Sequence, residues 1–381
     1  MSGLLTLPPL SLYIHIPWCL QKCPYCDFNS HEFQGSLPEN DYIDALLKDL
    51  DADLEYVQGR SLQSVFFGGG TPSLFSPASI HRLLQACRSR IPFEDDIEIT
   101  LEANPGTFEQ QKFVDYHAAG INRLSIGIQS FQASQLSKLG RVHNASEALH
   151  AAEFARQAGF DNFNLDLMFG LPGQQQEHAL ADLQQAIDLK PTHLSWYQLT
   201  LEPNTLFYRH PPTLPESSLI EKMQDAGIEL LAAAAFQRYE ISAFARDGLQ
   251  CKHNLNYWSF GDYLGIGAGA HGKITLLPQQ QIIRTRKIRQ PKTYLDPQQS
   301  ACISQAVIAR TELPLEFMMN VLRLPDGVRE RLFEERTGLP FSTVAGTIRD
   351  LQSQGLLKPR DIAPTARGMD LLNNVLQAFI N

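Results

Sequence analysis

The 381-residue sequence predicts an α/β fold built on a parallel sheet that curls into a barrel. The first 240 residues repeat one pattern: a short apolar run, a turn, and an amphipathic helical stretch. Six such units imply a parallel sheet that is either open and doubly wound or curled into a barrel. Polar residues or glycines follow nearly every apolar run, and a barrel brings such strand ends together at one mouth, so we favour the barrel.

Six apolar runs are the predicted strands, and they are short and rich in β-branched residues. They are LSLYIHI (10–16), SVFF (64–67), IEITLEA (97–103), RLSIGIQ (123–129), FNLDLMFG (163–170) and HLSWYQLTL (193–201). The helical segments between them include YIDALLKDLDADLEYV (42–57), SIHRLLQACRSR (79–90), KFVDYHAAG (112–120) and ALHAAEFARQAG (148–159). Several of them close with a glycine, which is typical of a helix C-cap.

Polar residues or glycines follow five consecutive predicted strands. They are Cys19 onward, the segment 68–72, the segment 102–105, Gln129 with Ser130, and Asp166. Any single one of these could merely end a strand. Because five ends agree, we expect them to form a functional site at the barrel mouth.

The pattern changes after Tyr239, and we divide the chain into a barrel (1–240), a β-rich extension (241–300) and a helical tail (301–381). The extension holds CKHNLNYW (251–258), the glycine-rich LGIGAGAHG (264–272) and a basic strand, IIRTRKIR (282–289). LGIGAGAHG is not a dinucleotide-binding loop, because such a loop opens a helix and the following KITLL reads as a strand.

The tail reads as helix, turn, helix from about Ala301, and its segment 336–358 resembles a small winged-helix unit. Such units often bind DNA. Residues 301–381, however, hold nine Lys plus Arg and nine Asp plus Glu, and the whole chain has a net charge of −9. Binding to phosphates needs clustered basic residues, so we expect a packing or docking module and no nucleic-acid partner.

The composition, with 43% hydrophobic and 19% charged residues, is that of an ordinary globular protein. The N-terminal MSGLLTLPPL lacks the basic and apolar regions of a signal peptide, and no run of about 18 uncharged apolar residues occurs. Six cysteines are too few and too unevenly placed for a disulfide framework. We therefore expect a cytoplasmic protein.

The stretch CLQKCPYCDF brings three cysteines together, Cys19, Cys23 and Cys26. A structural zinc site usually takes four ligands, so His15 or His31 would have to complete it here. An iron-sulfur cubane also takes four cysteines as a rule, one for each iron, and three would leave one iron open. The residues alone leave both kinds of site open.

This loop, placed directly after the first strand, resembles the cluster loop of the radical S-adenosylmethionine (SAM) superfamily. The resemblance implies a 4Fe-4S cluster held by Cys19, Cys23 and Cys26, with SAM chelated at the open iron. In that superfamily an electron from the cluster cleaves SAM to a 5′-deoxyadenosyl radical. The protein then supplies position and electrostatics.

The motifs YIHIPWC, FFGGGTPS, EANPGT, RLSIGIQSF and NLDLMFGLPGQ are similar to those of the oxygen-independent coproporphyrinogen III oxidase family over roughly residues 10 to 275. That resemblance implies a partial (β/α)6 barrel with SAM across its mouth. The residues that match SAM-binding positions of the family are Tyr13, Tyr25, Gly69, Gly70, Thr71, Glu102, Gln129, Arg141 and Asp166.

Two departures from the oxidase point to another branch of this family. Phe28 stands where the oxidase has a fourth cysteine, and the sequence begins almost directly at the first strand, without the longer N-terminal segment of the oxidase. With HNLNYW, these features resemble the HemW-type haem chaperones. That branch implies haem binding, delivery to acceptor proteins such as membrane respiratory enzymes, and a flavodoxin- or ferredoxin-like electron donor. The alternative is a coproporphyrinogen III dehydrogenase, an activity that we do not expect. The resemblance implies a scaffold that binds SAM without requiring that SAM be cleaved.

Candidates for a haem site lie between Cys251 and His271. Haem needs an axial ligand, an apolar slot and cations for its propionates. The candidate residues are His253, Tyr257, Trp258 and His271, with Cys251 as a further possible ligand. The alternative is a core histidine beside a packed Trp. The basic run 284–292 is either a solvated strand face or a partner for propionates or an acidic protein.

Overall fold

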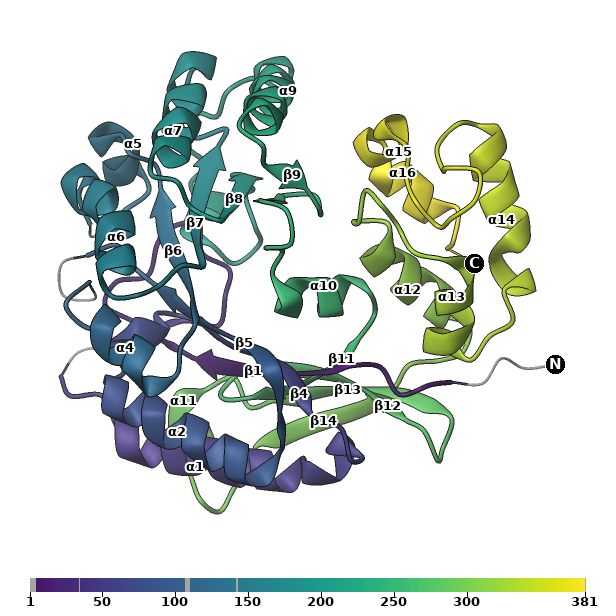
Figure 1. Cartoon of the computed structure of the whole chain (residues 1–381), viewed down its shortest axis with the longest axis horizontal. Helices are drawn as coiled ribbons and strands as arrows, with labels where there is room; N and C mark the ends of the chain where they lie inside the picture. The colour runs from purple at the N-terminus through teal and green to yellow at the C-terminus, as the bar shows by residue number, and fades with distance from the viewer. Residues whose placement is uncertain (1–4, 34, 107–109, 142, 381) are drawn as a thin grey trace.

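The computed structural model describes residues 5–33, 35–106, 110–141 and 143–380. Its main element is a twelve-stranded sheet in the order β14-β13-β12-β11-β1-β4-β5-β6-β7-β8-β10-β9. Strands β11, β1 and β4 to β8 run parallel, and the strands at both ends of the sheet are antiparallel. Figure 1 shows the strong curvature of the sheet.

Strand order decides between the two arrangements that the sequence left open. The six predicted strands lie side by side in chain order, β1-β4-β5-β6-β7-β8, as in a barrel, whereas a doubly wound sheet reverses its order at a switch point. Within the described residues β1 pairs with β11 and not with β8, so the barrel is partial. This fold class confirms the prediction.

The strand bounds agree closely with the predicted runs. The strands are β1 (Leu10–Ile16), β2 (Trp18–Cys19), β3 (His31–Glu32), β4 (Leu62–Gly69), β5 (Phe93–Ala103), β6 (Arg123–Gln129), β7 (Phe163–Phe169), β8 (His193–Gln198), β9 (Gln237–Arg238), β10 (Ala243–Ala245), β11 (Asp262–Ile266), β12 (His271–Leu276), β13 (Gln281–Lys287) and β14 (Cys302–Val307).

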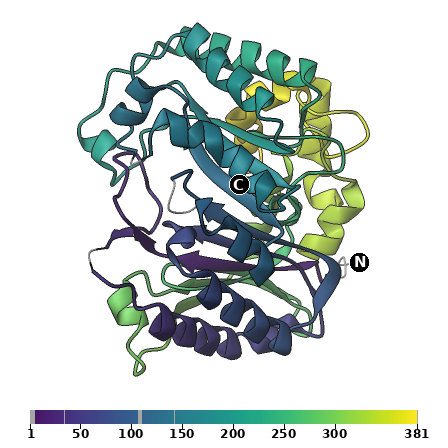
Figure 2. The same ribbon diagram turned by 60° about the vertical axis from the view of Figure 1, so that its left-hand side comes forward.

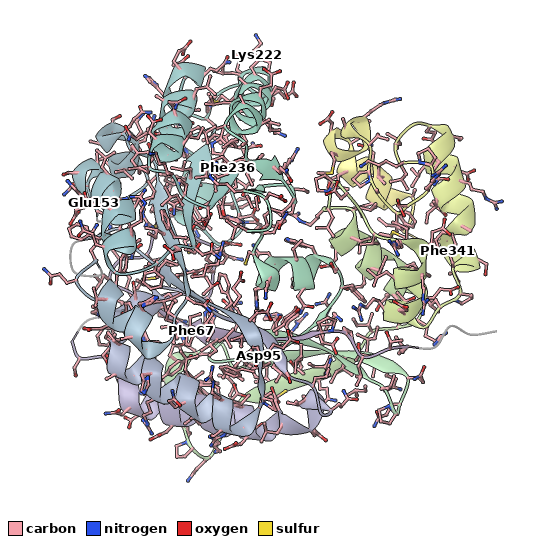
Figure 3. All side chains as sticks on the ribbon, viewed as in Figure 1. Phe67, Asp95, Glu153, Lys222, Phe236 and Phe341 are labelled. Atoms are coloured by element: carbon pink, nitrogen blue, oxygen red, sulfur yellow. The ribbon has the colours of Figure 1, made fainter. Side chains whose placement is uncertain are left out.

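Helices cover the convex side of the sheet, as Figure 2 shows. Those up to β10 are α1 (Glu39–Ala52), α2 (Pro77–Arg90), α4 (Phe113–Ala119), α5 (Ala133–Lys138), α6 (Ala145–Gln157), α7 (Gln176–Asp188), α8 (Leu206–Arg209) and α9 (Ser217–Ala233), with the 3-10 turns Leu54–Val57 and Pro72–Leu74. Figure 3 shows charged side chains such as Glu153 and Lys222 on the outside of α6 and α9, and Phe67 in the interior.

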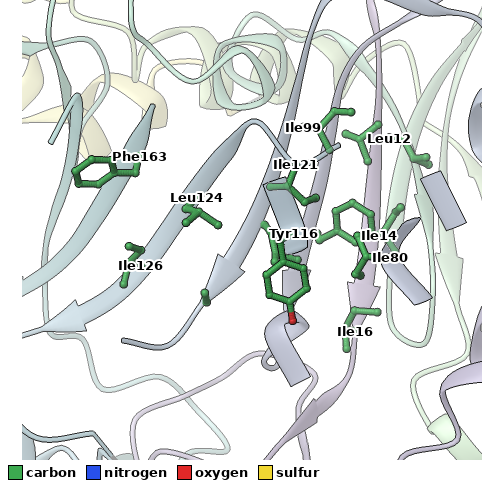
Figure 4. Packing of buried hydrophobic residues seen from close by; sticks show 14 of the residues in the cluster. Leu12, Ile14, Ile16, Ile80, Ile99, Tyr116, Ile121, Leu124, Ile126 and Phe163 are labelled. Carbon is green, nitrogen blue, oxygen red and sulfur yellow. The ribbon is translucent and has the colours of Figure 1, made fainter. Parts of the chain in front are cut away.

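The two faces of the sheet differ in chemistry because side chains alternate along each strand. Leu12, Ile14 and Ile16 of β1 point to the convex side and pack with residues such as Ile99 and Leu124 in the main core (Figure 4). The residues between them, Ser11, Tyr13 and His15, belong to the concave face. The concave face of the barrel is therefore polar.

The extension after Tyr239 joins the main sheet. Helix α10 (Lys252–Trp258) lies against the concave face, and β11 to β13 continue the sheet beyond β1 (Figure 1). The first residues of the tail, expected to be helical, form the edge strand β14. Their sequence, CISQAV, suits a strand because it contains the β-branched residues Ile303 and Val307.

A smaller helical unit follows, with α12 (Leu313–Val321), α13 (Glu330–Thr337), α14 (Ser342–Ser353), α15 (Ala366–Asp370) and α16 (Leu372–Gln377), after the short α11 (Pro291–Tyr294). It has its own apolar core around Phe317 and Phe333. The segment bounds 1–240, 241–300 and 301–381 stay a prediction. No helix of the described residues is long and apolar enough to cross a membrane.

Candidate functional site

The carboxyl ends of the parallel strands open into a pocket of about 300 Å³. Strands β4 to β8 and the cysteine loop after β1 all contribute to its wall. The predicted site residues that line it are Cys19, Cys23, Tyr25, Cys26, Gly69, Gly70, Thr71, Glu102, Gln129, Arg141 and Asp166. The convergence expected from the five strand ends is therefore present in the fold.

The cysteine loop leaves β1 through β2, which pairs with β3 and closes the loop at its base. Burial raises the pKa values of the Cys19 and Cys26 thiols. Hydrogen bonds from Thr71 and Ser30 have the opposite, smaller effect. Nη1 of Arg141 lies 3.5 Å from the Cys23 sulfur. Among the described residues no three His, Cys, Asp or Glu side chains are close enough together for a single metal ion.

The glycine turn after β4 is packed too tightly for side chains. A Cβ atom on Gly70 would lie 2.5 Å from the Trp18 carbonyl oxygen, and one on Gly69, whose φ is +116°, would lie 2.5 Å from the His15 ring. The Thr71 N–H donates to the same Trp18 oxygen at 2.8 Å. The turn is therefore held against the start of the cysteine loop, with its backbone at the pocket.

Two carboxylates face the pocket from neighbouring parts of the sheet. Glu102 Oε2 accepts a hydrogen bond from the Gly69 N–H at 3.2 Å. Burial, with a smaller effect of the Asp166 charge, raises the pKa of Glu102 to about 8. Asp166 accepts from Ser125 Oγ at 3.0 Å and from Asn164 Nδ2 at 2.8 Å. Burial also raises the pKa of Asp166, although these hydrogen bonds oppose the change.

Arg141 and Gln129 complete the polar wall. Nη2 of Arg141 donates to Asn104 Oδ1 at 2.7 Å and to the Gly127 carbonyl at 2.9 Å, whereas its buried Nε has no hydrogen-bond partner among the described residues. Gln129 has a φ of +67°, and its Oε1 accepts from the Tyr197 hydroxyl at 2.7 Å. The backbone at this strand end is thus held in a conformation that non-glycine residues rarely adopt.

Tyr13 lies beside the pocket and does not line it. Its hydroxyl is 3.0 Å from His15 Nδ1, and its ring lies 6.3 Å from the ring of His253. His15 Nε2 lies 2.8 Å from the Asn29 carbonyl oxygen of the cysteine loop. Tyr13 and His15 therefore connect the cysteine loop with helix α10.

Helix α10 brings together some of the candidate haem residues. The His253 ring packs against the Phe66 ring with centroids 5.0 Å apart, and its Nδ1 is 3.1 Å from Ser64 Oγ. Burial lowers the pKa of His253 to about 4, so the imidazole is neutral near pH 7. Tyr257 packs on Tyr263 at 5.3 Å.

The remaining candidates have other surroundings. Trp258 is covered by the Arg323 guanidinium of the helical unit, 4.2 Å from its ring. Cys251 is fully buried and its thiol donates to Glu98 Oε1 at 3.2 Å. These contacts are those of a cysteine that stabilises the fold. His271 is exposed at the start of β12, on the same concave face as Tyr13.

Comparison with known proteins gives this arrangement a family. Residues 13–186 match the radical SAM superfamily, and residues 308–371 match the HemN C-terminal domain. The chain is 50% identical over 378 residues to "Heme chaperone HemW" of Escherichia coli (strain K12), covering 98% of this chain and 99% of the relative. The chain belongs to the HemW family. Another HemW, from Haemophilus influenzae, is 51% identical over 98% of both chains.

The fold of this HemW-family chain is also similar to a solved structure, coproporphyrinogen III oxidase (HemN) from Escherichia coli, a radical SAM enzyme. The TM-score is 0.82 over 98% of this chain and 90% of the oxidase. Sequence identity is 24%, so this similarity concerns the fold alone.

Several pocket residues of this HemW-family chain were missed in the sequence. They are Ser125, Ser195 and Tyr197. A signal was present, because polar residues alternate with apolar ones in RLSIGIQ and HLSWYQ, as expected for strands with one polar face. Buried parallel strands usually read as continuous apolar runs, and that expectation hid the alternation.

The pKa of Glu102 leads to a stability prediction for the cofactor-free protein. A carboxyl whose folded pKa, about 8, exceeds its ordinary value of 4.5 stabilises the fold fully below pH 4.5 and loses this contribution as the pH rises through about 8. We expect the unfolding free energy of the unaltered protein, relative to Glu102→Gln, to fall between about pH 5 and about pH 9. Denaturant unfolding at several pH values measures this difference. Glu94→Gln, an exposed position on the same strand, is the control. If the difference in unfolding free energy from the unaltered protein changed equally with pH for both variants, the pKa assigned to Glu102 would be contradicted.

Proposed function

We propose that this chain is a haem chaperone on a radical SAM scaffold, which holds a 4Fe-4S cluster, SAM and haem and delivers haem to acceptor proteins. The observation that carries the proposal is spatial: in a HemW-family chain, the thiol-lined pocket and the HNLNYW helix occupy the same concave face, linked by Tyr13. The printed names of the relatives support the haem-chaperone assignment. We place this activity in the cytoplasm.

Cys19, Cys23 and Cys26 are the proposed cluster ligands. All three thiols border one pocket, and three thiolates suit a cubane that keeps one iron open. When bound, the cluster would hold SAM at that iron and supply electrons to it. Arg141, whose Nη1 lies at the Cys23 sulfur, would offset thiolate charge.

The proposed SAM site is the rest of the pocket wall. The backbone at Gly69, Gly70 and Thr71 would take the methionine part, because no side chain stands in its way. Arg141 has a buried Nε without a partner among the described residues, which is a donor free for a carboxylate. The acceptors and donors for the amino and ribose groups would come from Glu102, Gln129, Asp166 and Tyr25, with Tyr13 supporting the site from behind.

His253 is the proposed axial ligand of the haem. It is neutral, its Nδ1 is engaged by Ser64, and Nε2 is the nitrogen left for the iron. Tyr257 and Trp258 would shield the macrocycle from water, and His271 is the second candidate ligand.

The proposed partners are haem-accepting proteins, among them membrane respiratory enzymes, and a flavodoxin- or ferredoxin-like electron donor. We propose no nucleic-acid partner. The alternative activity, oxygen-independent coproporphyrinogen III dehydrogenase, is supported by the fold similarity and by the motifs that resemble the oxidase family. Against it stands Phe28, which is 61% exposed at the edge of the pocket where the oxidase family has a further cysteine.

The cluster assignment predicts about four irons and four sulfides per chain after anaerobic reconstitution, with an EPR signal upon reduction that changes when SAM is added. Replacing Cys19, Cys23 or Cys26 by Ala should abolish the cluster, because each thiolate holds a different iron. Cys87→Ala, a buried cysteine in α2, is the matched control. Stoichiometric zinc without sulfide would contradict the assignment.

The function is tested on one anaerobic sample by haem titration and by a porphyrinogen decarboxylation assay. We expect saturable haem binding with a Soret shift, transfer to an apo-haem protein, and no useful conversion of coproporphyrinogen III, since the extra cysteine is replaced by Phe28. Robust formation of protoporphyrinogen would reverse the ranking of the two functions.

The ligand assignment predicts that His253→Ala weakens haem binding and moves the Soret band, while the cluster survives. Ser64→Ala removes the contact to Nδ1 and keeps the imidazole, so it should bind haem more tightly than His253→Ala. A purely structural His253 gives a different result: the alanine variant melts earlier and binds haem as the parent does. His271→Ala and Cys251→Ala, titrated in parallel, show whether another residue is the ligand.

A further inference from the structure

Two arginines and a histidine gather on the concave face beside the cysteine loop. His271 and Arg286 are directly opposite each other on β12 and β13, and both are exposed. Arg289 follows β13 and reaches the loop, where its Nε lies 3.4 Å from Asn29 Oδ1. The His31 ring lies against the Arg289 backbone, and its buried Nε2 has no hydrogen-bond partner among the described residues.

The charges of this cluster are not balanced by carboxylates. Within the described part of the chain neither Arg286 nor Arg289 forms an ion pair, whereas the neighbouring Arg284 is paired with Glu316 of α12. Burial, together with the charges of Arg286, Arg284 and Arg289, lowers the pKa of His271. Like charges so close together repel each other, and a bound anion would relieve this repulsion.

The sheet places this cluster at one end of a row across four strands. Tyr13 of β1 pairs with Gly265 of β11. Gly265 lies beside His271 of β12, and His271 pairs with Arg286 of β13. Strands are about 4.8 Å apart, so three steps span about 14 Å, the scale of a porphyrin with its side chains. Gly265 has no room for a side chain, because a Cβ would lie 1.8 Å from the His271 carbonyl oxygen. The row thus runs from an aromatic end beside His253 to a cationic end.

We infer that Arg286 and Arg289 form an anion subsite that takes the two propionate carboxylates of the haem. The inference rests on the proposed function and adds the orientation of the macrocycle: with the iron at His253, its propionate edge points to β13 and the cysteine loop, and its apolar edge points away from them. Guanidinium groups bind carboxylates through paired, charge-assisted hydrogen bonds, which suits two adjacent arginines for a dicarboxylate. An acidic protein partner on the same arginines would leave haem binding independent of the propionates.

The test compares ferric haem with its dimethyl ester, in which both propionates are esterified, by spectrophotometric titration of the full chain at fixed ionic strength. The variant is Arg286→Gln with Arg289→Gln. The control is Arg360→Gln with Arg367→Gln, two exposed arginines of the helical unit that change the net charge equally. We expect the unaltered chain to prefer haem over the ester by about tenfold or more, and the variant to lose this preference while its affinity for the ester stays the same.

Each other result overturns the inference. If the unaltered chain binds haem and its ester equally, or if the variant retains the preference, the arginines do not hold the propionates. An equal loss for both ligands would mean that the substitutions disturb the slot itself, and thermal unfolding of the variant would show this. Failure of the unaltered chain to bind either ligand would overturn the proposed function as well, and only that result does so.

Discussion

The parallel pairing of β1 on both of its edges is the constraint on which the sites depend. On one edge, β4 brings the glycine turn against the root of the cysteine loop. On the other edge, β1 pairs with β11, which lies some 250 residues later in the chain. Strands β12 and β13, which follow β11, extend the sheet, and helix α10, which precedes β11, lies on the same concave face. A parallel partner cannot be reached by a tight hairpin, and here the chain forms the other strands of the barrel before β11 pairs with β1. The barrel stays open because β11 takes the edge that β8 would need for closure.

The polar concave face is stable only because its groups bond one another. Asp166 accepts hydrogen bonds from Ser125 and Asn164. Asn164 Oδ1 accepts from His193 Nδ1 at 2.7 Å, and His193 Nε2 then accepts from the Tyr239 hydroxyl at 2.7 Å. A buried polar group without a partner is costly, so such a network fixes its members in place. At the mouth, where the network ends, Glu102 keeps a pKa of about 8 and Arg141 keeps an unbonded Nε. Arg141 thus brings a buried donor without a partner among the described residues to the wall of the pocket.

Sequence alone predicted what depends on local pattern. The six strands of the barrel follow from short apolar runs, and the three thiols and the glycine turn are contiguous in sequence, so both were recognisable. The role of β11 and the position of α10 depend on contacts across some 190 to 250 residues, for example between His253 and Ser64, and no local signal carries them. The strand at 302–307 is an edge strand that is specified by its pairing with β13. The pocket residues Ser125, Ser195 and Tyr197 were hidden for another reason: parallel strands with a polar inner face do not read as the continuous apolar runs expected of a buried parallel sheet.

The hydrogen bonds of His15 show how the cysteine loop and helix α10 are mechanically joined. Burial lowers the pKa of His15 to about 4, so its ring is neutral and has one donor and one acceptor nitrogen. The Asn29 carbonyl can only accept, which assigns the proton to Nε2. Nδ1 must then accept from the Tyr13 hydroxyl, and this bond uses the only proton that Tyr13 can donate. The Tyr13 hydroxyl is therefore held by His15, which is bonded to the cysteine loop, while the Tyr13 ring lies 6.3 Å from the ring of His253. Contacts thus connect Asn29 of the loop to the candidate haem ligand through His15 and Tyr13.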